Sequence, residues 1–251
     1  HHGHFGVFWA VQVGAVAGFA VLGFMFRKHR QPISEEPSAE VRSWVPVVLL
    51  VLMILGLAFG SVVDEDFLWF GGTVCLTGGT VAVLWTWQRD SDTAKRILKS
   101  YDWHTTCFLM GVFMMVFALT ESGLIATAAR WVHRVTGGSV LSTFILIVLF
   151  SMLLSAFVDN IPYLAAMLPL VVQLSQTLEL DNNMVLAYGL LVGSCLGGNV
   201  TPVGATANVV SYGMLHRMGE DTTFWDFVKI GLPFTLAATT AASIFLWLVW
   251  M

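Results

Sequence analysis

Long runs with almost no charged residue limit what this chain can fold into. A run of about 20 apolar residues spans the hydrocarbon core of a bilayer as a helix. The 251-residue sequence has such runs at residues 5–26, 45–63, 67–87, 104–120 and 228–250, and longer, interrupted runs at 139–176 and 184–215. Because the runs are continuous and do not alternate, a β-barrel is disfavoured. The sequence therefore predicts an all-α polytopic membrane protein, with the lipid bilayer as its partner.

Composition supports this class and argues against several others. Hydrophobic residues make up 57% of the chain and charged residues only 11%, about half the charged fraction of a soluble domain. The net charge of −4 gives no indication of nucleic-acid binding. Cys75, Cys107 and Cys195 are far apart inside apolar segments, so they are interpreted as packing residues. No cofactor is predicted, apart from Na⁺ as a coupling ion.

Basic residues predict the orientation of the chain. If the segment 139–176 enters and leaves the membrane on one side, ten basic residues lie on one face and only two on the other. The positive-inside rule makes the ten-residue face cytoplasmic and places the C-terminus outside. The ten are Arg27, Lys28, Arg30, Arg42, Arg89, Lys95, Arg96, Lys99, Arg217 and Lys229, and the two are Arg130 and Arg134. The charge count thus favours a re-entrant helical hairpin at about 139–176.

The interruption of that hairpin is Asp159-Asn160-Ile161-Pro162. A carboxylate at bilayer depth is costly and usually faces a cavity, a partner or an ion path, so we expect Asp159 to be buried. Pro162 removes a backbone donor and disfavours helix before it. Free backbone groups at that depth are tolerated where they line protein or water. An alternative is an ordinary loop joining two complete crossings.

A second interruption, GGNVTPVGATAN at 197–208, divides the apolar run 184–215. It has no charge but is rich in glycines, amides and hydroxyls, unlike a solvent loop. Glycine allows close backbone approach, and Asn and Thr supply neutral oxygens. The segment is interpreted as a broken helix. Its alternative is close helix packing by small residues.

Two further acids lie near span ends. Glu121, in ALTESG, ends the run 104–120 and is a candidate coupling group, whereas Asp102 is interpreted as structural because an acid is favourable at a helix start. The amphipathic segment after Glu121 is expected to lie at the membrane interface.

Both interruptions, with their flanking residues, resemble a known superfamily. LSAFVDNIPYLAAMLPLV followed by GSCLGGNVTPVGATANVV is similar to the paired signatures of the ion transporter superfamily. The similarity is strongest to its arsenite-permease and NhaD-type branch, with citrate-transporter-like and melanosomal P-protein relatives. The helix YDWHTTCFLMGVFMMVFALTESG also resembles that branch.

The resemblance implies a fold, a site and partners. It implies one half of an inverted-repeat transporter, with residues 1–26 as the last span of a preceding half, 27–44 as a cytoplasmic linker and 45–251 as the C-terminal transport repeat. The missing N-terminal repeat is expected on the same or a separate chain, and a homodimer is expected. The implied ion-binding residues are Asp159, Asn160, Pro162, Asn199, Thr201, Gly204, Thr206 and Asn208, with Asp159 and Asn199 as Na⁺ ligands.

The sequence thus predicts a secondary active ion transporter of a prokaryotic inner membrane, coupled to a Na⁺ or H⁺ gradient and working by alternating access. Na⁺/H⁺ antiport and arsenite or other anion transport are both open, and a citrate-like carboxylate symporter or an uncoupled channel is the alternative. Paired Ser-Asn-Thr tips, used by carboxylate carriers, are absent. An enzyme is disfavoured because the apolar segments offer no nucleophile–base pair or metal cluster.

Overall fold

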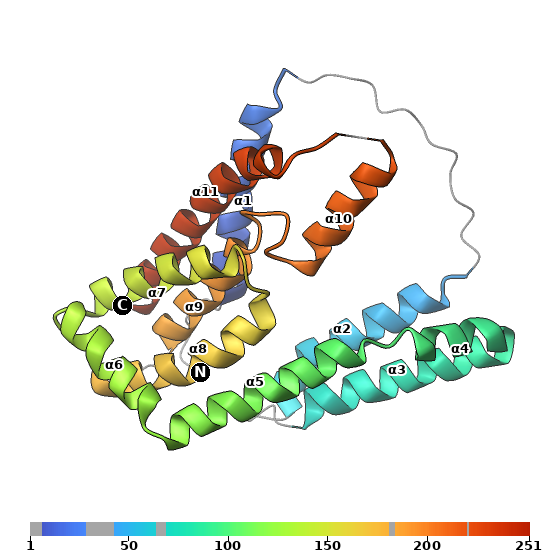
Figure 1. Cartoon of the computed structure of the whole chain (residues 1–251), viewed down its shortest axis with the longest axis horizontal. Helices are drawn as coiled ribbons and strands as arrows, with labels where there is room; N and C mark the ends of the chain where they lie inside the picture. The colour runs from blue at the N-terminus through green and yellow to red at the C-terminus, as the bar shows by residue number, and fades with distance from the viewer. Residues whose placement is uncertain (1–6, 29–42, 64–68, 181–183, 220) are drawn as a thin grey trace. The chain divides into compact units, whose positions relative to one another are not determined.

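The computed structural model describes residues 7–28, 43–63, 69–180, 184–219 and 221–251, and every regular element in these ranges is an α-helix (Figure 1). The expected all-α class is confirmed. The helices are α1 (Val7–Met25), α2 (Val45–Val63), α3 (Phe70–Arg89), α4 (Ser91–Lys99), α5 (Trp103–Glu121), α6 (Leu124–Val135), α7 (Val140–Ser155), α8 (Asn160–Thr177), α9 (Met184–Gly197), α10 (Thr206–Arg217) and α11 (Phe224–Trp250).

Several of these helices have the length and composition of membrane spans. In the described ranges α1, the stretch Ser91–Glu121 and α11 qualify, and α6 with α7 forms a fourth candidate although the pair is bent by 116°. Val45–Ala58 and α9 are apolar but shorter. α3 forms where a span was expected, but four glycines and four threonines make it less apolar. Between the apolar runs 67–87 and 104–120, where no helix was predicted, the structure has the helix α4.

The chain divides into two compact units, His1–Arg30 with Thr106–Met251, and Gln31–Thr105. In the first unit, α1 packs along α11 through small residues. A Cβ atom on Gly14 would lie 2.9 Å from the Ala238 carbonyl oxygen and 3.3 Å from the Ala242 Cβ. Such close backbone approach is typical of helix pairs in membranes, where van der Waals packing drives association.

Helix α9 is the centre of the first unit, since it packs on α7, α8 and α11. Its glycines are one turn apart and bring the backbone of α9 into close contact with the backbone of α7. A Cβ on Gly193 would lie 2.6 Å from the Val148 carbonyl oxygen, and one on Gly197 would lie 2.5 Å from that of Met152. This contact fixes the ends of α7 and α9 relative to each other, and both ends belong to the candidate site.

The reversal between α6 and α7 uses two glycines in the left-handed region, Gly137 (φ 63°) and Gly138 (φ 72°). Other residues are strained at such angles. α6 then packs on α8, burying Ala129 while Arg130 and Trp131 stay exposed. This one-sided burial agrees with the amphipathic character expected for the segment.

In the second unit, α3 packs on α2 and on α4. Gly78 makes room for the Met53 side chain of α2, whose Cγ would lie 2.6 Å from an added Cβ. At the other end of α3, Asp90 accepts hydrogen bonds from the backbone N–H groups of Asp92 and Thr93. Asp90 therefore caps α4 and allows it to fold back along α3.

Candidate functional site

The two interruptions predicted from the sequence meet in the first unit. α7 ends at Ser155 and α8 begins at Asn160, while α9 ends at Gly197 and α10 begins at Thr206. The arms of the expected hairpin each pack on α9, and the Tyr163 hydroxyl of α8 donates to the Ser151 hydroxyl of α7 at 3.0 Å. Two helix C-terminal ends and two N-terminal ends therefore gather around the residues 156–159 and 198–205.

Gly204 lies at the closest approach between the interruptions. A Cβ there would lie 2.6 Å from the Gly198 carbonyl oxygen, 2.8 Å from that of Ala156 and 2.9 Å from that of Ser155. All three oxygens belong to the C-terminal ends of α7 and α9, where peptide dipoles leave partial negative charge. Gly204 is required here because any side chain would displace backbone.

Thr201 fastens the second interruption to the first. Its side chain is only 2% exposed, and its hydroxyl donates to the Ala156 carbonyl oxygen. The Thr201 hydroxyl oxygen in turn accepts from the Gly204 backbone N–H at 3.1 Å. Thr201, predicted as a ligand, therefore uses its hydroxyl within the protein.

Ser155 joins α7, α8 and α9 at the same place. Its hydroxyl oxygen lies 2.6 Å from the Ser194 carbonyl oxygen and 2.6 Å from Asn160 Oδ1. One hydroxyl proton serves only one of these acceptors. The competition is relieved if the Asn160 amide is turned so that its NH₂ donates to Ser155, or if a cation lies beside these oxygens. Both amide positions lie beside Gly198, at 3.1 Å and 3.5 Å from its added Cβ.

Asp159 lies on the rim of the site. The Thr206 hydroxyl donates to Asp159 Oδ2 at 3.3 Å, which links the start of α10 to the start of α8. Asp159 is exposed, so the expectation that this carboxylate is buried is wrong for this structure. The reason is that the turn 156–159 ends at the surface of the unit, where the carboxylate is accessible.

The two asparagines of the second interruption differ. Asn208 Nδ2 donates to the Gly198 and Thr201 carbonyl oxygens at 2.9 and 3.2 Å and so holds the broken segment in shape. The Asn199 side chain makes no hydrogen bond within the described ranges, and its backbone carbonyl oxygen lies only 2.2 Å from an added Cβ on Gly231 of α11. No hydrogen bond joins the predicted Na⁺ ligands Asp159 and Asn199 in the described ranges.

Two other predicted residues lie within helices of the structure. Pro162 is in the first turn of α8, where a missing N–H is tolerated, so it begins a helix and does not break one. Glu121 is the last residue of α5 and exposed. No hydrogen bond joins Glu121 to either interruption in the part of the chain that the structure describes.

The helix N-terminal ends at the site are not capped by side chains. α8 begins after Asp159 and α10 after Ala205, and neither residue makes a side-chain cap hydrogen bond. Away from the site, Ser139 caps α7 and Thr223 caps α11. Backbone N–H groups in the first turns of α8 and α10 thus remain available to an anion.

Sequence reasoning missed several residues that build the site. Ser151 and Ser155 were not predicted because they lie within an apolar arm. Their spacing of four residues nevertheless places both on one helix face. Ser194 is likewise a hydroxyl residue within an apolar helix, α9. Gly231 and Thr235 of α11 contact the ends of α9, with the Thr235 hydroxyl 3.4 Å from the Leu196 carbonyl oxygen. No local signal in the sequence identifies this last pair.

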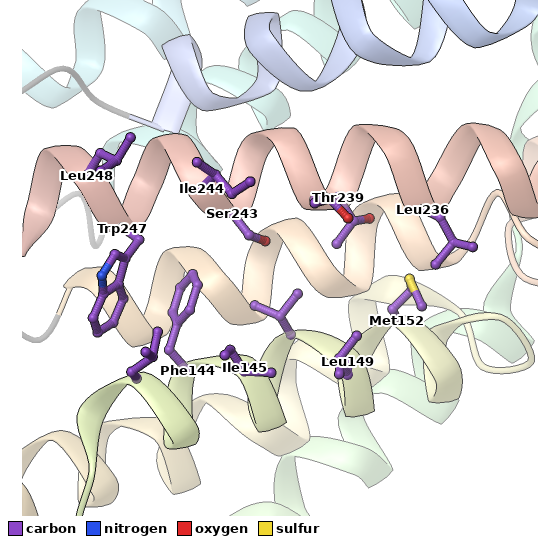
Figure 2. Close-up of a pocket in the computed structure, with 13 residues that line it drawn as sticks. Phe144, Ile145, Leu149, Met152, Leu236, Thr239, Ser243, Ile244, Trp247 and Leu248 are labelled. Atoms are coloured by element: carbon purple, nitrogen blue, oxygen red, sulfur yellow. The ribbon is translucent and has the colours of Figure 1, made fainter.

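A hollow elsewhere in the first unit holds none of the predicted site residues. It lies between α7 and α11, has a volume of about 330 Å³ and is lined mainly by apolar side chains such as Phe144, Leu149 and Trp247 (Figure 2). The buried hydroxyl oxygens of Thr239 and Ser243 lie on its α11 side without a hydrogen-bond partner in the described ranges. Its apolar lining does not fit a small hydrated ion.

The fold and the paired interruptions define an integral membrane protein of the transporter type. The sequence model of a family described as "Citrate transporter" matches residues 2–193, more than half of the chain. The chain belongs to this citrate transporter family. The resemblance stated from the signatures is confirmed at this level.

Relatives carry names of the same kind. A protein of Mycobacterium bovis named as an uncharacterized transporter is 38% identical over 157 residues, which cover 62% of this chain and 37% of the relative. A Synechocystis protein with a similar name is 31% identical over 193 residues, covering 70% and 43%. The P protein of mouse is 34% identical over 156 residues, covering 60% and 19%. The matches thus span less than half the length of these relatives.

Proposed function

We propose that this chain forms the ion-binding part of a cation-coupled secondary transporter that moves a small anion, with a citrate-like carboxylate as the first candidate. One observation supports the proposal most strongly: the ends of four half-helices gather at the two interruptions. In secondary transporters, helix C-terminal ends and unwound carbonyls coordinate Na⁺ or H⁺, and helix N-terminal ends face anionic groups. The C-terminal ends of α7 and α9 and the N-terminal ends of α8 and α10 both lie at the two interruptions.

The coupling cation would bind at the ends of α7 and α9. Carbonyl oxygens of Ser155, Ala156 and Gly198 surround Gly204, and the Asn160 amide lies beside them. Asn199 remains a candidate ligand because its side chain makes no hydrogen bond to the described residues. Neutral oxygens suit a hard cation such as Na⁺. We propose no resident metal, since this ion is transported cargo.

The anion would bind at the uncapped ends of α8 and α10. Neither end has a side-chain cap hydrogen bond, and the Thr206 hydroxyl at the start of α10 donates to Asp159 Oδ2. The family description favours a carboxylate over arsenite. No basic side chain is hydrogen-bonded to the interruptions within the described residues, so the bound cation and the helix dipoles would balance the anion's charge.

Na⁺/H⁺ exchange is a second candidate, favoured by Asp159. An exposed carboxylate beside the cation-binding end can bind a cation or exchange a proton. Na⁺ and H⁺ would then compete for Asp159. Glu121 is a further candidate coupling acid. An uncoupled channel differs from both because it gives ohmic current and no uphill accumulation.

Alternating access would need the ion-binding elements to move together. We propose that the hairpin and the broken helix, which both belong to the first unit, move as one body between the two access states. A complete carrier would further need the partner repeat, on the same or another chain, and would assemble as a homodimer. The charged loops would face the cytoplasm of a prokaryotic cell.

Ligand-dependent melting of the purified chain tests this proposal. We expect Na⁺ to raise the melting temperature and citrate to raise it further only when Na⁺ is present. Asp159→Asn abolishes coupled flux of the complete transporter in proteoliposomes while membrane insertion is retained. Asp92→Asn, an exposed acid on α4, is the matched control and leaves flux unchanged. If arsenite stabilises the chain and citrate does not, the proposed substrate would be arsenite. If no cation stabilises the chain, the proposed cation site would be refuted.

A further inference from the structure

The second unit contains an apolar groove that the transport proposal does not use. It has a volume of about 590 Å³ and lies between α3 and the segment formed by α4 and the residues after it. α3 contributes Cys75, Leu76 and Leu84 among others, and the opposite wall is formed by Leu98 and Trp103 among others. Apart from Thr80, its lining is apolar or aromatic, and the whole groove lies within one compact unit.

Basic side chains flank one wall of this groove. Ala94 is fully buried against the rest of the unit and Leu98 lines the groove, so this face of α4 points toward α3. Lys95 and Lys99, four residues apart, lie on the neighbouring face, next to Leu98. Two ammonium groups thus stand one helical turn apart along the groove.

The acids near these lysines are mostly held in other contacts, and among the described acids Asp92 alone is paired with one of the two lysines. Asp90 is held by the N-terminus of α4, where hydrogen bonds from the Thr93 hydroxyl and backbone keep the pKa of this carboxyl below its ordinary value. Asp102 accepts from Thr105 at the start of α5. Lys95 is paired with Asp92 at 3.7 Å on an exposed surface, where such pairs are weak. Lys99 has no salt bridge in the described part of the chain.

Apolar and charged features together identify the occupant as a lipid. Leu98, Tyr101 and Trp103 are about half to two-thirds exposed, and aromatic residues beside lysines are typical of the membrane interface. An acyl chain fits the groove, and an anionic head group fits the pair of ammonium groups, whereas a zwitterionic head group would gain less. We infer that α3 and α4 form a binding site for one anionic phospholipid, with its acyl chain in the groove and its phosphate between Lys95 and Lys99.

Lipid titration of the detergent-purified chain, followed by native mass spectrometry, tests the head-group contact. We expect dioleoylphosphatidylglycerol to bind more tightly than dioleoylphosphatidylcholine. Each lysine contributes about fivefold, so Lys95→Gln with Lys99→Gln weakens phosphatidylglycerol binding about 25-fold. The matched control is Arg130→Gln with Arg134→Gln, another pair four residues apart on the amphipathic α6, and it leaves this binding unchanged. Equal binding of both lipids, or no loss in the lysine variant, would overturn the inference.

A groove-filling variant tests the acyl chain. Gly79 lines the groove and a Cβ there meets nothing within 4 Å, so Gly79→Leu occupies the groove without a backbone clash. Gly72→Leu on the same helix, also with open space and outside the groove, is its control. We expect only Gly79→Leu to weaken phosphatidylglycerol binding. Similar binding by both leucine variants would show that the groove is not used.

Cys75 provides a reporter inside the groove. With Cys107 and Cys195 replaced by serine, Cys75 is the remaining thiol. We expect phosphatidylglycerol, but not soluble glycerol phosphate, to slow its alkylation by N-ethylmaleimide. Equal protection by glycerol phosphate would mean that no acyl chain enters the groove and would overturn the inference.

Discussion

Gly204→Ala is the substitution for which the structure gives the sharpest expectation. The added methyl group would lie 2.6, 2.8 and 2.9 Å from the carbonyl oxygens of Gly198, Ala156 and Ser155. All three neighbours are backbone atoms, so no side chain can rotate away and the two interruptions must separate. Overpacking of this kind costs about 1–3 kcal/mol, which lowers the melting temperature of a unit of this size by about 2–12 °C.

The same methyl group removes the space beside the helix ends. We therefore expect Gly204→Ala to lose Na⁺-dependent stabilisation as well as intrinsic stability, in melting curves recorded with and without Na⁺. The control is Gly213→Ala on α10, where a Cβ meets nothing within 4 Å. In a helix interior this change stabilises by up to about 1 kcal/mol. A Gly204→Ala protein that melts and responds to Na⁺ as the wild type does would refute the packing of the two interruptions described above.

Two further predictions concern stability. Thr201→Val keeps the shape of the side chain but leaves the Ala156 carbonyl oxygen and the Gly204 N–H without their buried partner. We expect thermal unfolding to show a loss of about 1–3 kcal/mol in the free energy of unfolding. An unchanged melting temperature would contradict the role given to this hydroxyl. Gly14→Leu places a side chain against the Ala238 carbonyl oxygen and should destabilise the α1–α11 pair by about 1–3 kcal/mol. Gly23→Leu, which meets nothing within 4 Å, is its control, and equal melting of the two leucine variants would disprove the close packing of α1 on α11.

Local sequence was sufficient to predict the long apolar helices and both interruptions, but not α4. Uncharged apolar runs form helices because every backbone polar group must be satisfied within the segment at bilayer depth. The interruption at 197–208 was visible because glycine, proline and amide residues cannot continue such a run, and the structure ends α9 at Gly197 and starts α10 at Thr206. Pro162 was misread because the residue types do not tell whether a proline precedes a helix or lies in its first turn.

Tertiary structure decided how the interruptions are held and which groups remain available for an ion. The family resemblance implied Thr201 and Asn208 as ligands, but their polar atoms bind carbonyl oxygens of the protein. Ser155 became part of the site only because α9 packs on α7 through Gly193 and Gly197. Periodicity and composition determine which backbone groups are left free within one segment. Which of them meet another segment depends on contacts between residues some 40 positions apart, such as Ser155 with Ser194, and a local pattern contains no record of such contacts.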